Sequence, residues 1–249
     1  MDDRVAIVTG GGSGIGAATA RLFASHGLRV ALVGRRADRL DSVAAEIGNG
    51  AFAVPSDLAR RDAPGEVVAA VLERAGRLDV IVNSAAAFKL ELVEEFTIDA
   101  FDEHVAINVR APYFLVRAAL PALRASPAPV VVNVSSAAAA MYRRRQTVYG
   151  LTKAALEHLT KNLAAELAPD RIRVACVRPG PVATEIHTGA VADPEARLRE
   201  LGTLVPLGRV GQPEEIARWI WYLVDREAEW VTGTVIAVDG GRVLGSPEV

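Results

Sequence analysis

The sequence of 249 residues has one cysteine, no strong excess of either charge and no long apolar run. A lone cysteine cannot form an intrachain disulfide, and Cys176 lies in the apolar run Ile172 to Val177, so we expect a buried packing residue and a reducing, cytoplasmic location. The net charge of -2 argues against a dedicated nucleic-acid-binding protein, which would carry a basic excess. No apolar stretch is long enough to span a bilayer, and no charged segment followed by an apolar core opens the sequence. These absences favour a small-molecule partner, with no nucleic acid and no membrane.

Short apolar runs alternate with helix-length amphipathic segments, which is typical of successive βαβ units. The runs are apolar at consecutive positions, as expected for strands of a parallel sheet that is covered on both faces. We predict an α/β fold, with a single Rossmann-type domain over residues 1–249 and a doubly wound seven-stranded parallel sheet with helices on both faces. The predicted strands are Val5–Val8, Val30–Val33, Ala51–Val54, Val80–Val82, Val130–Val134, Ile172–Val177 and Val235–Val238.

Helices are expected in the segments that separate these strands. Pro112 and Pro121 predict that the longest segment is a pair of helices or one bent helix. The predicted helices are Gly14–Ser25, Arg39–Glu46, Pro64–Arg74, Asp99–Leu123, Val148–Leu167 and Pro213–Val224.

A glycine-rich turn joins the first strand to the first helix. Glycines there permit a tight turn and let helix amides face a pyrophosphate. A G-x-G-x-x-A pattern is weak evidence alone, but between a strand and a helix it favours dinucleotide binding over a purely structural turn. The candidate cofactor-binding residues are Gly10, Gly12, Ser13, Gly14, Ile15 and Gly16.

The end of the second strand, Gly34-Arg35-Arg36, indicates which nicotinamide nucleotide is preferred. An acidic residue there would bind the ribose 2'-hydroxyl, whereas arginine pairs with a 2'-phosphate. The sequence therefore predicts NADP(H) rather than NAD(H), with Arg35 as the first phosphate ligand and Arg36 as the second. The alternative is that both are solvated surface arginines. Asp57, beside Leu58, is expected to contact adenine or to cap a helix.

Tyr149 and Lys153 are four residues apart on a predicted helix, and Ser136 lies upstream. Residues four apart share a helix face, so the ammonium would lie near the phenol and lower its pKa. A tyrosine with a lowered pKa can exchange a proton with an alcohol oxygen. The spacing alone is more typical of a solvated helical pair, but the glycine turn and Ser136 together favour a nucleotide-dependent redox enzyme.

These motifs resemble the short-chain dehydrogenase/reductase family over essentially the whole chain, and within it the NADP-dependent 3-oxoacyl-acyl-carrier-protein reductases. The family's T-G-x-x-x-G-x-G pattern matches Thr9 to Gly16, and its catalytic residues match Asn108, Ser136, Tyr149 and Lys153. The resemblance implies hydride transfer between the nicotinamide and a ketone or secondary alcohol, without a metal. Tyr149 would be the general acid/base, Ser136 would bind the substrate oxygen, Lys153 would lower the pKa of Tyr149 and hold the nicotinamide ribose, and Asn108 would fix a water. A homotetramer, or failing that a dimer, is also implied.

The resemblance extends to two further cofactor-contacting segments. The stretch after the sixth strand supplies Pro179, Gly180, Val182 and Thr184, and the end of the fourth strand supplies Asn83 and Ala85. Ala86 stands where the family commonly has glycine, so a slightly different backbone is expected there.

The surroundings of the substrate are less well defined by the sequence. Arg143-Arg144-Arg145 could meet an anionic substrate group, or form a solvated or subunit-contact loop. Residues 185–207 are expected to form a mobile helical lid, with His187 as a possible substrate contact. A catalytically silent nucleotide-binding regulator, or a lyase or epimerase on the same fold, stays open as an alternative function. The substrate itself also stays open among 3-oxoacyl thioesters, steroids, sugars and specialised metabolites.

Overall fold

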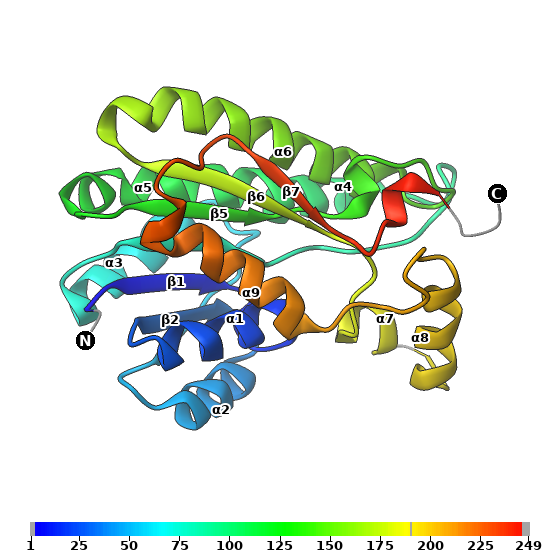
Figure 1. The fold of residues 1–249 in the computed structure, drawn as a ribbon, viewed down its shortest axis with the longest axis horizontal. Coiled ribbons are helices and arrows are strands. Elements are labelled where there is room, and N and C mark those ends of the chain that lie inside the picture. Colours follow the sequence, from blue (N-terminus) through cyan, green and yellow to red (C-terminus); the bar gives the residue numbers. More distant parts are fainter. Residues whose placement is uncertain (1–2, 190, 246–249) are drawn as a thin grey trace.

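The computed structural model describes residues 3–189 and 191–245, and it contains the predicted doubly wound parallel sheet (Figure 1). The strands of this seven-stranded sheet lie in the order β3-β2-β1-β4-β5-β6-β7, and every neighbouring pair is parallel. The predicted domain and lid include residues outside the described ranges. The strands are β1 (Val5–Thr9), β2 (Arg29–Gly34), β3 (Phe52–Pro55), β4 (Val80–Asn83), β5 (Val130–Val134), β6 (Arg173–Pro179) and β7 (Val235–Val238).

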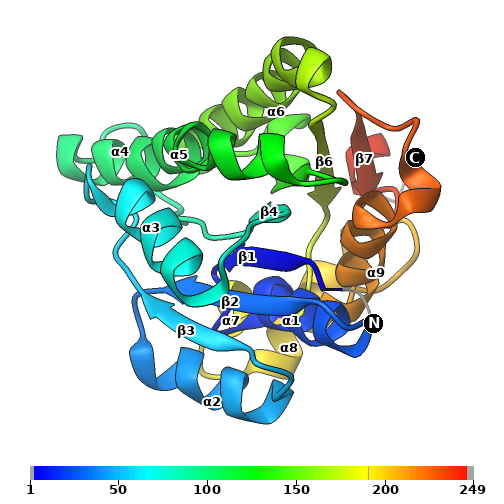
Figure 2. The same ribbon diagram turned by 90° about the vertical axis from the view of Figure 1, so that its left-hand side faces the viewer.

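Helices cover both faces of the sheet, as predicted. Figure 2 shows α1, α2 and α9 on one face and α3, α5 and α6 on the other. The helices are α1 (Gly14–Ser25), α2 (Ala37–Ile47), α3 (Ala63–Ala75), α4 (Ile98–Val105), α5 (Ala111–Ala125), α6 (Thr147–Leu167), α7 (Glu185–Thr188), α8 (Pro194–Thr203) and α9 (Pro213–Val224). In the described part of the chain, no helix is long and apolar enough to cross a membrane.

Each face of the sheet has its own hydrophobic core. Ile7 of β1 packs in the core that is covered by α3, α5 and α6, whereas its neighbours Ala6 and Val8 pack in the core beneath α1 and α9. Successive strand residues point to opposite faces, so two covered faces require apolar residues at every position. This explains the unbroken apolar runs of the sequence.

The long segment between β4 and β5 is two α-helices joined by a π-helical turn, Ala106–Arg110. Pro112 lies in the first turn of α5, where a missing N–H costs little, and Pro121 lies inside α5. The prediction of a pair of helices or a bent helix is therefore confirmed. The turn contains Asn108 and brings it beneath the loop that follows β4.

Successive strands are added on opposite sides of β1. The chain runs outward through β2 and β3 on one side and through β4 to β7 on the other. The connections after β1 and β4 diverge at the carboxyl edge of the sheet, where ligands of such folds bind. Figure 1 shows α7 and α8 at this edge.

Candidate active site

A cavity of about 410 Å³ opens at the carboxyl edge of the sheet. Residues from the glycine turn, the ends of β4, β5 and β6, and the segment 185–187 line it. The predicted site residues that line this cavity are Gly10, Ser13, Gly14, Ile15, Gly16, Arg36, Ala85, Ser136, Tyr149, Lys153, Pro179, Gly180, Val182 and Thr184. The fold thus brings together, around one cavity, residues that lie far apart along the chain.

The glycine turn is shaped as a cradle that side chains would fill. A Cβ at Gly16 would lie 2.2 Å from the carbonyl oxygen of Gly10, which no real side chain tolerates. Gly10 has φ +69 and approaches the backbone of Ala85. The N-cap residue Ser13 makes no side-chain capping bond, and the first turn of α1 has no acidic residue. The amides that open α1 are therefore available to an anion, and the residues fit a dinucleotide pyrophosphate.

Thr9 ties the glycine turn to the loop after β4, a role that sequence reasoning missed. Its hydroxyl accepts hydrogen bonds from the amides of Ser84 and Ala85, both at 3.0 Å, and donates to the Val82 carbonyl at 3.3 Å. The position of Thr9 at the start of the T-G motif is the signal that could have revealed it. The expected backbone change at Ala86 involves no left-handed conformation, because the described non-glycine residues with positive φ lie elsewhere.

Several predicted cofactor contacts lie outside the cavity lining. Asn83 is buried and donates to the side chain of Asn133 at 2.8 Å, so it supports the sheet edge from beneath. Asp57 accepts from the Ala59 amide at 3.0 Å, which closes a local turn rather than capping a helix. Leu58 is buried, and Gly12 packs against Arg39.

The two arginines after β2 point to different partners. Arg36 lines the cavity, donates to the Ser13 hydroxyl at 3.3 Å and pairs with Glu185 at 3.1 Å. Arg35 lies outside the cavity lining, 3.6 Å from Glu103. Adjacent residues at a strand end face opposite sides, so Arg36 lines the cavity and Arg35 does not. The order of the two as phosphate ligands stays a prediction.

Tyr149 and Ser136 form the polar centre of the cavity. Tyr149 is 8% exposed, and it lines the cavity together with Ser136. Burial raises the pKa of Tyr149 to about 12, and the Ser136 hydroxyl opposes this only in part. At neutral pH the phenol therefore holds its proton.

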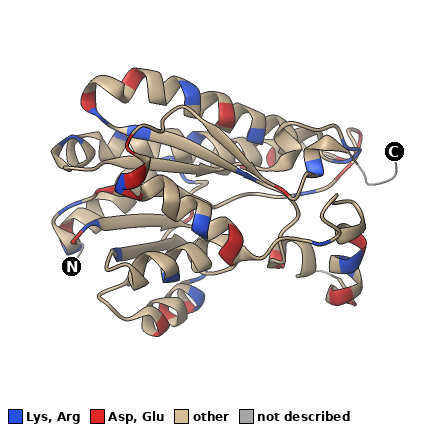
Figure 3. Cartoon of the chain, viewed as in Figure 1, with Lys and Arg blue, Asp and Glu red and all other residues tan. Residues whose placement is uncertain are grey.

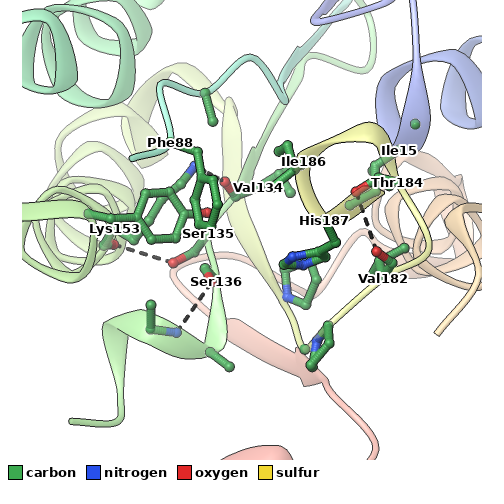
Figure 4. A pocket seen from close by; sticks show the side chains of 18 of the residues that line it. Ile15, Phe88, Val134, Ser135, Ser136, Lys153, Val182, Thr184, Ile186 and His187 are labelled. Atoms are coloured by element: carbon green, nitrogen blue, oxygen red, sulfur yellow. Dashed lines mark hydrogen bonds between the residues drawn. The ribbon is translucent and has the colours of Figure 1, made fainter. Parts of the chain in front are cut away.

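Lys153 is buried beside this pair, one helical turn beyond Tyr149. Its Nζ donates to the Val134 carbonyl at 2.9 Å (Figure 4). The same atom lies 5.8 Å from the centre of the Tyr149 ring. Burial lowers the pKa of Lys153 to about 8, so the ammonium is mostly charged at neutral pH. The lowering of the Tyr149 pKa by Lys153 stays a prediction, because burial is the largest effect on this pKa and raises it.

Two adjacent serines follow β5, and their partners separate their roles. Ser135 donates to Glu157 at 2.8 Å, and Arg178 closes a two-bond ion pair on the same carboxylate at 2.7 and 2.6 Å. The hydroxyl of Ser135 is thus occupied by a hydrogen bond within the protein. Ser136 faces the cavity, accepting from the Ala138 amide at 3.2 Å (Figure 4). Ser136 is the serine available to a ligand oxygen.

Asn108 lies beneath the site and is fully buried. Its oxygen accepts from the Ala87 amide at 2.8 Å, and its nitrogen donates to the Ala87 carbonyl and the Thr152 hydroxyl, both at 3.0 Å. These bonds join the loop after β4 to α6, the helix that carries Tyr149. The side chain is therefore engaged in protein contacts, so a water held at this position would use the backbone of the π-helical turn.

The other end of the cavity is basic. Arg143 lines it, whereas Arg145 pairs with Glu95 at 3.0 Å. His187 also lines the cavity, with its ring 6.0 Å from that of Phe88 (Figure 4). Burial lowers the pKa of His187, as do the charges of Arg197 and Arg143. Arg242, which sequence reasoning missed, lines the same space.

Comparison with known proteins places this geometry in context. A family model described as enoyl-(acyl carrier protein) reductase matches residues 10–242. The short-chain dehydrogenase/reductase FrzI of Cladobotryum sp is 38% identical, over 97% of this chain and 96% of that protein. A short-chain dehydrogenase/reductase from Serratia marcescens is 34% identical with a TM-score of 0.89, over 96% of this chain and 98% of the other. The 3-ketoacyl-(acyl-carrier-protein) reductase from Brucella melitensis, complexed with NADH, is 32% identical with the same TM-score and coverage.

Proposed function

Because the chain belongs to the short-chain dehydrogenase/reductase family of oxidoreductases, we propose that it transfers a hydride between NADP(H) and a ketone or secondary alcohol. The observation that carries the proposal is that Tyr149 and Ser136 both line the cavity that the glycine turn enters. The pair offers a proton donor and a hydroxyl to a single ligand oxygen. The likeness to reductases of the same fold supports the reaction class.

In the direction of reduction, Tyr149 donates its proton to the oxygen of the carbonyl group. Its raised pKa keeps the phenol protonated, which suits a general acid. Ser136 donates a hydrogen bond to the same oxygen as negative charge develops on it. In the direction of oxidation, the phenolate of Tyr149 takes the proton of the alcohol. The charge of Lys153 favours this anion, and the carbonyl of Val134 fixes the position of its Nζ.

The nicotinamide, when bound, supplies or accepts the hydride. We propose that the amides at the start of α1 hold the pyrophosphate and that Lys153 holds the nicotinamide ribose. Pro179, Gly180, Val182 and Thr184 form the wall after β6. We also propose that Asn108 acts through the loop after β4, whose position it fixes.

Arg36 supports a preference for NADP(H) over NAD(H). It lies at the glycine turn, beside Ser13. Its partner Glu185 is exposed, so a phosphate could replace this carboxylate in the ion pair with Arg36. The test is a matched pair of variants. Arg36→Ala should reduce the preference for NADPH over NADH, measured as a ratio of kcat/KM values, by roughly tenfold. Arg35→Ala should leave it within roughly twofold. The reverse result would return the assignment to Arg35.

The reaction itself is tested by NADPH oxidation against a panel of 3-oxoacyl thioesters, cyclic ketones and oxo acids. Tyr149→Phe should abolish turnover while NADPH still binds. Tyr142→Phe, at a fully exposed tyrosine in the neighbouring loop, is the matched control. Turnover that survives in Tyr149→Phe would contradict the proposed role. NADPH binding without turnover of any substrate would favour the silent regulator, and conversion of a substrate without net NADPH consumption would favour a lyase or epimerase.

We further propose a homotetramer, with a dimer as the alternative, in the cytoplasm. Exposed apolar side chains on α4, α5, α6 and α9 support an association of subunits, and light scattering on the purified chain measures its state. These side chains are Ile98, Phe101, Tyr113, Phe114, Leu151, Trp219 and Tyr222.

A further inference from the structure

Arg242 is a buried cation that contacts no group of opposite charge among the described residues. It follows the glycines that end β7, is 9% exposed and lines the cavity. No hydrogen bond or ion pair reaches its guanidinium from any residue between 3 and 245 that the structure describes. The nearby Asp239 uses its two carboxylate oxygens to accept the amides of Gly241 and Val243, at 2.9 and 3.0 Å.

The charges around Arg242 add to its isolation. Arg143 lines the same cavity and repels it, and together with burial this lowers the pKa of Arg242, while Asp239 opposes the effect. Among the described lining residues, Glu185 carries the one carboxylate, and it pairs with Arg36 at the glycine turn. Acidic and basic residues are otherwise interspersed over the helices (Figure 3). The uncompensated positive charge is therefore local to this part of the cavity.

A guanidinium stays protonated at any physiological pH, and burying it without a partner is unfavourable. The apolar side chains of Phe88, Met141 and Leu201 line the same cavity and lower the local polarity. In such surroundings an arginine binds a planar oxyanion with two parallel hydrogen bonds, and the interaction is stronger than in water. The site is thus complementary to an anionic group on a ligand with an apolar body.

We propose that Arg242, assisted by Arg143, binds a carboxylate on the substrate, which is therefore an oxo acid or the corresponding hydroxy acid. This inference rests on the proposed function. The carbonyl carbon gains the hydride of NADPH, its oxygen gains the proton of Tyr149, and the carboxylate changes no bond. A phosphate on a long carrier arm has the same oxyanion chemistry, but it would remain near the exposed rim rather than at a residue that is 9% exposed.

The experiment measures kcat/KM for oxo acids of increasing length, from 3-oxobutanoate to 6-oxoheptanoate, against their methyl esters. In the wild type, one acid should exceed its ester by roughly 30-fold or more, because the ester leaves Arg242 unpaired. Arg242→Met should remove this advantage and keep turnover of the ester. Arg242→Lys should keep part of it, because lysine retains the charge and loses the two-bond geometry. Arg124→Met, at an exposed arginine paired with Asp170, is the matched control and should retain the full advantage.

Each outcome bears on the inference separately from the proposed function. Turnover of neutral ketones with equal acid and ester values in the wild type would overturn the carboxylate site and leave the reductase intact. If Arg242→Met lowers kcat/KM only for acetoacetyl-CoA, the arginine binds a phosphate of the carrier. This result would also overturn the carboxylate site. If no ketone is turned over, the thermal shift given by 3-oxobutanoate decides. A shift in the wild type that Arg242→Met abolishes supports the anion site, and its absence refutes it. Arg242→Met should not lower the melting temperature without ligand, whereas a merely structural arginine would.

Discussion

Lys153→Met provides a quantitative test of the electrostatics at the centre of the site. Lys153 is 2% exposed, and burial lowers its pKa from the ordinary 10.5 to about 8. Between these two values the unfolded chain holds the proton and the folded chain releases it. Because the unfolded state then binds more protons, the contribution of Lys153 to the free energy of unfolding rises with pH.

The two pKa values set the size of the effect. Holding the charged lysine in the folded chain costs about 3 kcal/mol at pH 7, and about 1 kcal/mol of this cost is relieved between pH 7 and pH 9. Urea unfolding of wild type and Lys153→Met, at fixed protein concentration and compared at one urea concentration near the midpoints, measures the change. The wild type should gain about 1 kcal/mol relative to the variant over this range.

Lys161→Met is the matched control, because Lys161 is an exposed lysine on the same helix, α6. Its difference from the wild type should not change between pH 7 and pH 9. A constant difference for Lys153→Met as well would refute the reasoning. It would show that the ammonium of Lys153 is hydrated in the folded chain. Water at this position would also hydrate Tyr149, and burial would then not raise the pKa of Tyr149.

Three further substitutions test the frame around the site. Gly16→Ala should abolish NADPH binding in a fluorescence titration, because its Cβ would lie 2.2 Å from the Gly10 carbonyl oxygen; unchanged affinity would contradict the cradle. Glu157→Leu should cost about 3 kcal/mol in urea unfolding, since it leaves the guanidinium of Arg178 without its carboxylate; a loss below about 1 kcal/mol would place this pair among ordinary surface ion pairs. Asn108→Leu should cost about 2 kcal/mol and reduce kcat, because three buried hydrogen bonds are lost; full stability with full activity would refute a positioning role.

The fold could be predicted from the sequence because its signals are local. Unbroken apolar runs marked the strands, and two helices have the predicted bounds, Gly14–Ser25 and Pro213–Val224. Each begins at a residue type that favours a helix start at that point. The first follows a glycine turn, and the second has a proline in its first turn. The π-helical turn was predicted only as a bend, because proline positions indicate where a helix deviates and not how its hydrogen bonds rearrange.

The parts of the site that were missed depend on residues distant in sequence. Arg35 and Arg36 are neighbours in sequence, but their ion-pair partners Glu103 and Glu185 reach them only in the folded chain. The pKa of Tyr149 depends on burial that α6 acquires through packing, which the spacing to Lys153 does not report. Arg242 follows a glycine pair and belongs to no motif. Its position just after the last strand, at the carboxyl edge where ligands bind, was the available signal.

Two of the arginines that line the cavity, Arg36 and Arg242, are expected to contribute unequally to ligand selection. Arg36 already has a carboxylate partner in Glu185, so a cofactor phosphate there exchanges one ion pair for another. The free energy gained by binding the phosphate is therefore only the difference between its ion pair with Arg36 and the ion pair of Arg36 with Glu185. Both are exposed to solvent, and this limits the preference for NADPH. Arg242 has no such partner in the described part of the chain, and a ligand carboxylate would form a new ion pair in buried surroundings. Under the proposed function, discrimination between substrates with and without an anionic group should therefore exceed discrimination between NADPH and NADH.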